Sequence, residues 1–195
     1  TSPLNNPGDY TEANAWQYFW TPAQYDVEGM IQLLGGKKMF TAQLDSFFSI
    51  KALNPNKHLG QEAMIGQYAH GNEPSHHIAY LYAYSDKPER GKELITQICN
   101  EFYDNTTTGM IGNEDCGQMS AWYIFSTLGF YPVNPAGGEY VIGKPQVESA
   151  IVYLKDGKLL KIRYKNAQSV RLNNQPLNDF KLRHKEISVG GTLQF

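Results

Sequence analysis

The sequence predicts a mainly α protein that ends in a small antiparallel β segment. Over residues 10–130, apolar residues recur at the three-to-four-residue spacing of buried helix faces. After Tyr131 and Pro132 the pattern changes to short runs with the alternation of half-buried strands. We therefore expect a helical part over residues 1–135 and an antiparallel β segment over residues 136–195.

The expected helices follow one another with short connections. Pro22 opens one helix, Gly35-Gly36 ends it, and Lys37–Ile50 forms the next, so this pair should be an antiparallel hairpin. Further helices are expected after Pro74, from Lys87 to Tyr103 and from Met119 to Leu128. Helix hairpins that each carry a polar motif at a helix start favour a barrel of paired helices with its cleft at one end.

The β segment contains three alternating runs and two turn signals. The runs are Ile151–Leu154, Leu159–Tyr164 and Val170–Leu172. Asp156-Gly157 and Asn173-Asn174 are typical of hairpin turns.

Composition and charge exclude some classes of function. The net charge of -2 comes with mixed charges and no basic stripe, which argues against a nucleic-acid partner. No apolar run approaches a membrane span, and the first residues lack the pattern of a signal peptide. Cys99 and Cys116 allow at most one disulfide and do not decide the compartment.

Aromatic residues make up 13% of the chain, and many stand beside Asn, Gln, Glu or His. Flat apolar faces next to hydrogen-bonding groups suit sugars, whose rings have an apolar face and a polar rim. The alternative is a helical core that simply uses large residues.

The first polar motif is Tyr-Thr-Glu-Ala-Asn-Ala-Trp-Gln-Tyr, residues 10–18. Thr11 is expected to cap a short helix. On that helix, the side chains of Glu12, Trp16 and Phe19 share one face. Desolvation of a carboxyl group among aromatic rings raises its pKa and suits it to donate a proton at neutral pH. On this stretch alone, a first-turn Glu favoured by the helix dipole is the simpler interpretation.

The second polar motif covers residues 67–77 and precedes a helix. Asn72 and Glu73 place hard oxygen donors side by side, which suits Ca²⁺. His76 and His77 are adjacent, so they lack the i, i+4 spacing of a helical zinc pair. One of them is expected to face the cleft and the other to be structural.

The third polar motif, Gly-Asn-Glu-Asp-Cys-Gly-Gln-Met-Ser-Ala-Trp-Tyr, covers residues 112–123 and leads into an apolar helix. Asp115 lies near the positive end of that helix, among amides, and should stay ionised there. A plain helix cap is the alternative interpretation of Asp115.

In this order, the three motifs resemble glycoside hydrolase family 92, a family of calcium-dependent exo-α-mannosidases. The resemblance extends to Gly-Phe-Tyr-Pro at residues 129–132 and to the β segment. It implies an (α/α)6 catalytic barrel preceded by an N-terminal β-sandwich domain. The implied reaction is the inverting hydrolysis of terminal non-reducing α-linked mannose from mannose-rich glycans, by an enzyme that is periplasmic, secreted or on the cell surface.

The resemblance also implies roles for single residues. Glu12 matches the general acid and Asp115 the general base, whose carboxyl groups an inverting enzyme holds about 6.5–9.5 Å apart. Asn113 stands where some members have a second acid. Asn72 and Glu73 match ligands of the Ca²⁺ cofactor.

Five further residues of the same motifs are candidates for the site. Gln17 is a third candidate calcium ligand. The residues expected to bind the sugar are Trp16, His70, His76 and Gln118.

The chain is much shorter than members of this family, and we expect it to be a C-terminal portion that works with a missing N-terminal β-sandwich domain. An alternative is that the isolated portion is inert, with at most calcium or sugar binding. A helical scaffold is a further alternative, which requires the three motifs to lie far apart in space.

Overall fold

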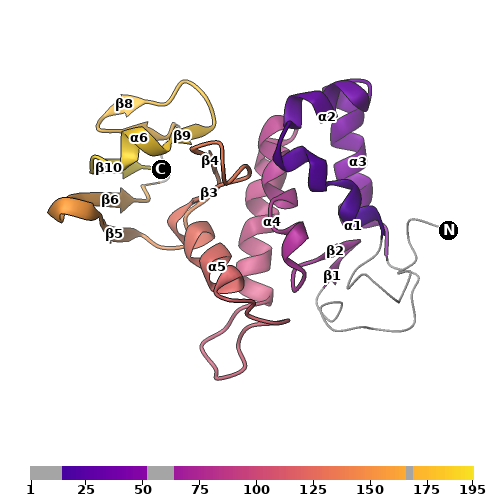
Figure 1. The fold of residues 1–195 in the computed structure, drawn as a ribbon, viewed down its shortest axis with the longest axis horizontal. Helices are drawn as coiled ribbons and strands as arrows, with labels where there is room; N and C mark the ends of the chain where they lie inside the picture. Colours follow the sequence, from indigo (N-terminus) through magenta and orange to yellow (C-terminus); the bar gives the residue numbers. More distant parts are fainter. Residues whose placement is uncertain (1–14, 52–63, 166–168) are drawn as a thin grey trace. The chain divides into compact units, whose positions relative to one another are not determined.

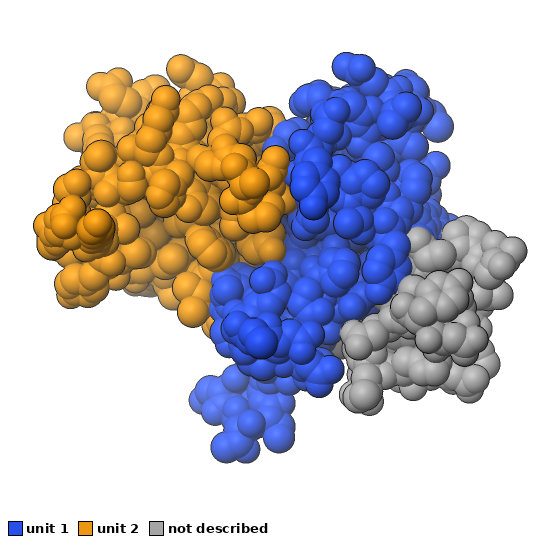
Figure 2. Space-filling view, viewed as in Figure 1, with its two compact units in different colours: residues 1–122 blue, residues 123–195 orange. Residues whose placement is uncertain are grey.

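The computed structural model describes residues 15–51, 64–165 and 169–195. The chain forms two compact units, Thr1–Trp122 and Tyr123–Phe195 (Figures 1 and 2). The helix α5, Gln118–Leu128, begins in the first unit and ends in the second.

The described part of the first unit is built from helices and one short hairpin (Figure 1). Several elements are 3-10 helices, labelled η. In chain order the elements before α5 are α1 (Ala15–Phe19), η1 (Thr21–Gln24), α2 (Val27–Leu33), α3 (Lys37–Ser49), β1 (Met64–Ile65), β2 (Tyr68–Ala69), η2 (Glu73–Ser75), η3 (Ile78–Tyr84) and α4 (Pro88–Glu101).

The predicted pair of helices around Gly35-Gly36 is confirmed as α2 and α3. Both glycines have positive φ, 88° and 105°, so they turn the chain where other residues would be strained. The Asp26 side chain caps α2 by accepting a hydrogen bond from the backbone N–H of Gly29, at 2.8 Å. The sequence pattern did not predict that Pro22 belongs to a separate 3-10 helix.

Aromatic rings fill the core of the first unit. Trp20 is fully buried and meets the rings of Phe40 and Phe47 edge-on, at centroid distances of 5.8 and 6.0 Å. Phe48 packs against Tyr68, with centroids 5.3 Å apart. The predicted inward face of α3 is therefore confirmed, and it anchors α1 and β2.

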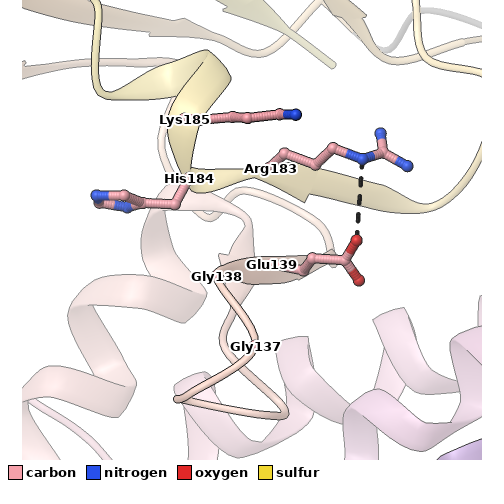
Figure 3. A pocket seen from close by; sticks show the side chains of 6 residues that line it. All are labelled: Gly137, Gly138, Glu139, Arg183, His184 and Lys185. Atoms are coloured by element: carbon pink, nitrogen blue, oxygen red, sulfur yellow. Dashed lines mark ion pairs between the residues drawn. The ribbon is translucent and has the colours of Figure 1, made fainter.

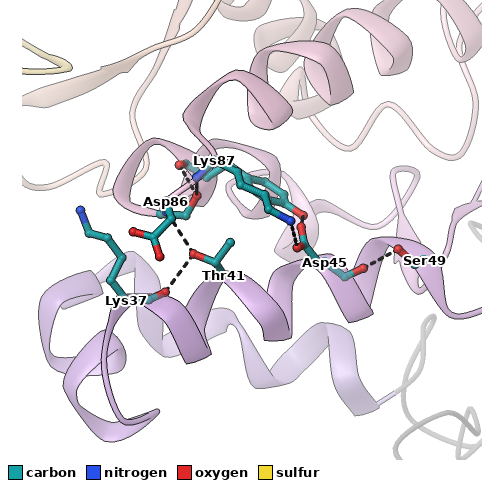
Figure 4. A network of polar contacts seen from close by, with 8 residues as sticks. Lys37, Thr41, Asp45, Ser49, Asp86 and Lys87 are labelled. Atoms are coloured by element: carbon teal, nitrogen blue, oxygen red, sulfur yellow. Dashed lines mark hydrogen bonds and ion pairs between the residues drawn. The ribbon is translucent and has the colours of Figure 1, made fainter.

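A polar network ties α3 to the turn before α4 (Figure 4). Asp45 accepts hydrogen bonds from the Tyr82 hydroxyl at 2.9 Å and from the Lys87 ammonium at 2.5 Å. Thr41 accepts from the backbone N–H of Asp86 at 3.0 Å. Burial and the hydrogen bond to Asp45 raise the pKa of Tyr82, so its hydroxyl remains a neutral donor.

Helix α4 packs against η3, and Gly91 allows the close approach. A Cβ atom at Gly91 would lie 2.8 Å from the Ala79 carbonyl oxygen and 2.8 Å from the Tyr82 Cβ. The predicted buried face of α4 is confirmed by Leu94 and Ile98, both fully buried. The α4 helix therefore packs against η3, the helix that directly follows the second polar motif.

The second unit contains two sheets and a short helix, α6 (His184–Ile187). One sheet has the strand order β5-β6-β10-β7-β8 and the other β3-β4-β9. The bounds are β3 (Phe130–Tyr131), β4 (Glu139–Ile142), β5 (Ser149–Tyr153), β6 (Leu159–Arg163), β7 (Arg171–Leu172), β8 (Gln175–Pro176), β9 (Lys181–Arg183) and β10 (Gly191–Gln194); η4 (Lys155–Gly157) lies between β5 and β6.

The pairing is antiparallel in these sheets except between β10 and β6, which are parallel. The expectation of a purely antiparallel segment was therefore wrong at this pair, which joins strands distant in sequence. Both predicted turns are confirmed: Asp156, Gly157, Asn173 and Asn174 have φ values of 60°, 72°, 52° and 67°.

The second unit has its own apolar core. Its fully buried members include Ile162, Leu182 and Leu193, which come from β6, β9 and β10. Gly129, with φ of 95°, ends α5 as predicted and lies where a Cβ would press on Pro145 and Phe195. None of the helices in the described ranges is long and apolar enough to cross a bilayer.

Candidate active site

The first unit brings the three polar motifs together around the buried segment from Gln67 to His77. The described part of the first motif is residues 15–18, which lie in α1. Glu12, the candidate general acid, lies outside the described residues. The third motif is the loop that leads into α5.

Gln17 joins the first motif to the second. Its buried side chain accepts a hydrogen bond from the backbone N–H of Ala69 at 3.3 Å and donates one to the Asn72 carbonyl at 3.4 Å. The Asn72 side chain in turn donates from Nδ2 to the Tyr18 hydroxyl at 3.3 Å. Two residues proposed as calcium ligands are thus held against each other through hydrogen bonds.

His77 connects the second motif to Trp20, which follows the first motif by two residues. Its Nε2 lies 2.9 Å from the Trp20 carbonyl oxygen, and both residues are fully buried. Because a carbonyl only accepts, His77 Nε2 carries the hydrogen. Burial lowers the pKa of His77 to about 4, so the ring is neutral at neutral pH. Of the two adjacent histidines, His77 therefore has a structural role.

The second motif also contacts the third. A Cβ atom at Gly112 would lie 2.8 Å from Gly71 Cα and 2.9 Å from its carbonyl oxygen, so these two glycines allow the backbones to touch. The Trp122 indole N–H donates to the His76 carbonyl at 2.9 Å. The three motifs thus form one cluster, and the scaffold alternative, which needs them far apart, is wrong.

His70 lies at the centre of this cluster and is fully buried. Its Nδ1 is 2.7 Å from the Tyr68 hydroxyl and its Nε2 is 2.6 Å from the Tyr103 hydroxyl. Tyr103 donates to the Met119 carbonyl in α5 at 3.2 Å. The ring also meets Trp122 edge-on, with centroids 4.4 Å apart.

Burial and then the neighbouring His76 lower the pKa of His70 well below its usual value, so the ring is neutral. Both ring nitrogens of His70 contact tyrosine hydroxyls. The described residues around His70 enclose its ring. The expected contact of His70 with the sugar therefore stays a prediction.

The loop before α5 has an unusual backbone. Asp115, Cys116 and Gly117 follow one another with positive φ values of 46°, 58° and 95°. This conformation costs a non-glycine residue about 1–2 kcal/mol. Strain of this kind often occurs where a loop has to present functional side chains.

Glu114, not Asp115, caps α5. Its carboxylate accepts hydrogen bonds from the backbone N–H groups of Gly117 and Ser120, the latter at 3.2 Å. Hydrogen bonds from Ser120 and Gly117 lower the pKa of Glu114 and keep it ionised. Asp115 and Asn113 are exposed, so capping does not occupy the candidate base.

The candidate calcium ligands offer oxygen donors that suit a hard cation. Because Asn72 donates from Nδ2 to the Tyr18 hydroxyl, its Oδ1 points away from that hydroxyl, and the next residue in the chain is the half-buried Glu73. Glu73 Oε1 is shielded from solvent. Two such residues fit the oxygen preference of Ca²⁺, which takes six to eight ligands, so they would supply only part of a calcium site. Within the described ranges, no three His, Cys, Asp or Glu side chains gather into a metal-binding group.

The second unit has a surface pocket of about 470 Å³, lined by Gly137, Gly138, Glu139, Arg183, His184 and Lys185 (Figure 3). Arg183 is paired with Glu139 at 3.8 Å and with Asp179 at 3.2 Å. His184 Nδ1 lies 2.9 Å from the Tyr140 hydroxyl. These polar side chains join β9 and α6 to β4, and none of the predicted site residues lines the pocket.

Sequence reasoning missed three residues of the cluster: Tyr68, Tyr103 and Glu114. A Glu shortly before an apolar helix is a capping signal that indicates Glu114. Tyr103 gave no such signal, because it follows α4 in a polar turn and reaches His70 only in the folded chain.

The buried histidines make stability depend on pH. His76 and His77 have pKa values lowered to about 4, mainly by burial, so the unfolded chain binds more protons than the folded chain between pH 6.5 and 4. The free energy of unfolding should therefore decrease as the pH is lowered from 6.5 to 4, by up to about 3 kcal/mol per histidine. His77→Gln keeps a donor for the Trp20 carbonyl but cannot be protonated, so urea unfolding at several pH values should show a flatter profile. An unchanged profile would contradict this account of His77.

Comparisons with known proteins show the family of this chain. The family model described as "Glycosyl hydrolase family 92 catalytic domain" matches residues 1–195. An uncharacterized secreted glycosidase of Arthroderma benhamiae is 31% identical over 205 residues, which cover 99% of this chain and 24% of the relative.

Two solved structures from Bacteroides thetaiotaomicron cover the whole chain. A family GH92 alpha-mannosidase is 36% identical with a TM-score of 0.89, and 27% of its length is covered. A family GH92 inverting mannosidase is 33% identical with a TM-score of 0.81, and 28% of its length is covered. The chain thus spans about a quarter of the length of these relatives. Since the family model matches it from end to end, the chain belongs to glycosyl hydrolase family 92.

Proposed function

We propose that this chain is part of the catalytic domain of an α-mannosidase that removes terminal non-reducing α-linked mannose from mannose-rich glycans. The observation that supports this most is the cluster of the three motifs, joined at Gln17–Asn72 and Gly71–Gly112. Two family members with the same fold and about one third identity are an alpha-mannosidase and an inverting mannosidase. The secreted relative supports action outside the cytoplasm, in the periplasm, at the cell surface or in the medium.

The helices of the first unit are proposed to be part of an (α/α)6 barrel. The relatives are about four times longer, so the rest of the barrel and an N-terminal β-sandwich domain would come from chain outside these residues. In this arrangement the residues around His70 close one part of the cleft, and other parts of the barrel complete it.

The proposed reaction proceeds with inversion. Glu12 protonates the glycosidic oxygen while Asp115 takes a proton from the attacking water, which forms the new bond to the anomeric carbon as the leaving group departs. Asp115 is suited to this role because it is exposed and Glu114 performs the capping. Asn113 would orient the water or a sugar hydroxyl. The name of one relative, an inverting mannosidase, supports the stereochemistry.

Calcium is proposed as the cofactor, with Asn72 and Glu73 as ligands and Gln17 as a further candidate. Bound calcium would supply a positive charge that holds sugar hydroxyls. Gln17 Oε1 already accepts from Ala69, so Gln17 acts at least by positioning the Asn72 carbonyl. Trp16 and Gln118, both half-buried, are proposed to contact the sugar.

A second candidate function follows from the length of the chain. Since it spans about a quarter of its relatives, the isolated polypeptide would be catalytically inert, with at most calcium or sugar binding. Assaying this polypeptide beside the full-length enzyme on one α-mannoside separates the two possibilities.

The acid and the base should respond differently to the leaving group. Glu12→Gln and Asp115→Asn should each lower turnover of a natural mannoside by about 10²–10⁴-fold in the full-length enzyme. An aryl mannoside with a nitrophenol leaving group needs no protonation, so it should partly rescue Glu12→Gln but not Asp115→Asn. Steady-state kinetics on both substrates measure this. Equal losses on the two substrates would rule out the assignment.

Calcium removal should abolish activity. Thorough chelation of the full-length enzyme should stop hydrolysis, and added Ca²⁺ should restore it. Glu73→Gln removes one negative charge from the proposed site and should raise the calcium concentration needed for half-maximal activity. The matched control is Glu93→Gln, an exposed residue on α4, which should need no more calcium than the wild type. Activity that survives chelation would refute the calcium proposal.

A further inference from the structure

The hydrogen bonds of His76 determine which atom of Gln118 is free. His76 Nε2 lies 3.0 Å from the His70 carbonyl oxygen. A carbonyl only accepts, so Nε2 carries the hydrogen. Burial lowers the pKa of His76 to about 4, which leaves the ring neutral, so Nδ1 carries a lone pair and no hydrogen.

His76 Nδ1 therefore acts as an acceptor, and its partner has to be a donor. That partner is Gln118 Nε2, at 3.2 Å. The amide nitrogen of Gln118 thus faces His76, and its carbonyl oxygen Oε1 points away from the histidine. Gln118 is only half-buried, whereas His76 is 1% exposed.

Gln118 also directly follows the loop before α5, which carries the candidate base. Its backbone N–H donates to the Asp115 carbonyl at 3.3 Å, and Asp115 is the candidate base. A fixed carbonyl oxygen at this place can accept a hydrogen bond from a hydroxyl group, whereas a flipped amide would present a donor instead.

We infer that His76 is a positioning residue that holds the Gln118 amide so that Oε1 accepts a hydrogen bond from a hydroxyl group of the sugar. This inference rests on the proposed function for the identity of the ligand. It also gives His76 a role other than the direct sugar contact expected from the sequence. The ring itself packs against protein, with centroids 4.9 Å from His70 and 6.0 Å from Trp122.

Two substitutions of His76 separate positioning from simple structural support. The amide of Gln reaches the place of Nε2 and that of Asn the place of Nδ1. His76→Gln therefore keeps a donor for the His70 carbonyl and loses the acceptor for Gln118. His76→Asn keeps an acceptor near Gln118 and leaves the buried His70 carbonyl without its donor, so it should be the less stable variant.

The experiment measures kcat/KM of the full-length enzyme on an aryl α-mannoside, together with urea unfolding. We expect His76→Gln and Gln118→Met each to lower kcat/KM by about three- to tenfold, the value of one hydrogen bond, and the double variant to lose no more than either one. His76→Asn should stay within about twofold of the wild type despite its lower stability. The inference would be overturned if the less stable His76→Asn lost more activity than His76→Gln. It would also be overturned if the loss in the double variant were the product of the two single losses.

Two further measurements separate failure of this inference from failure of the proposed function. If His76→Gln weakened calcium activation by the same factor as kcat/KM, Gln118 Oε1 would bind the cation, and the assignment to a sugar hydroxyl would be wrong. A wild-type enzyme that does not hydrolyse the mannoside would refute the proposed function. The amide orientation would then be judged by the ¹⁵N-labelled Gln118 side-chain signal, whose hydrogen-bonded N–H should be lost in His76→Gln and kept in His76→Asn.

Discussion

The structure of the site depends on the cost of burying polar groups without partners. The segment from Gln67 to His77 runs through the core of the first unit, where an unpaired donor or acceptor costs about 1–3 kcal/mol. Several of its groups meet that requirement with partners distant in sequence: Gln17 for Ala69 and Asn72, Trp20 for His77, and Trp122 for His76. The hydrogen bonds that offset the cost of burying these polar groups thus also bring the three motifs together.

Neutral histidines suit this arrangement because each offers one donor and one acceptor. His76 receives the amide of Gln118 and donates to the backbone at residue 70. His70 links two tyrosine hydroxyls, one of which contacts the first turn of α5. The start of α5 is therefore fixed from inside the core, while the adjoining loop with Asp115 stays at the surface.

The sequence predicted those parts of the fold that have a regular local pattern. Helix α3 and the buried face of α4 followed from apolar spacing, and the hairpin turns followed from Asp156-Gly157 and Asn173-Asn174. The pattern predicted a helix after Pro74 but not that η3 is a 3-10 helix, because a seven-residue apolar run does not distinguish a period of 3.0 from one of 3.6. The two-residue strands β1 and β2 are too short to show alternation.

The types of residue in the site were also predictable, but their contacts were not. Asn72, Asp115 and Gln118 stood out by their chemistry within the motifs. Gln17 reaches Asn72 across 55 residues, and Tyr103 reaches His70 across 33, so no local pattern could have revealed either pair. The capping role went to Glu114 because the left-handed turn at residues 115–117 leaves the Glu114 carboxylate facing the free N–H groups of α5.

The three motifs are proposed to build a single inverting site. A crystal structure of the full-length enzyme would test this proposal most directly, through the distance between the carboxyl groups of Glu12 and Asp115. In a single inverting site this distance should be about 6.5–9.5 Å, with room for one water molecule between Asp115 and the anomeric carbon of a bound mannoside. A separation of about 5 Å would indicate a retaining enzyme, and carboxyl groups that face different cavities would contradict the claim of a single site.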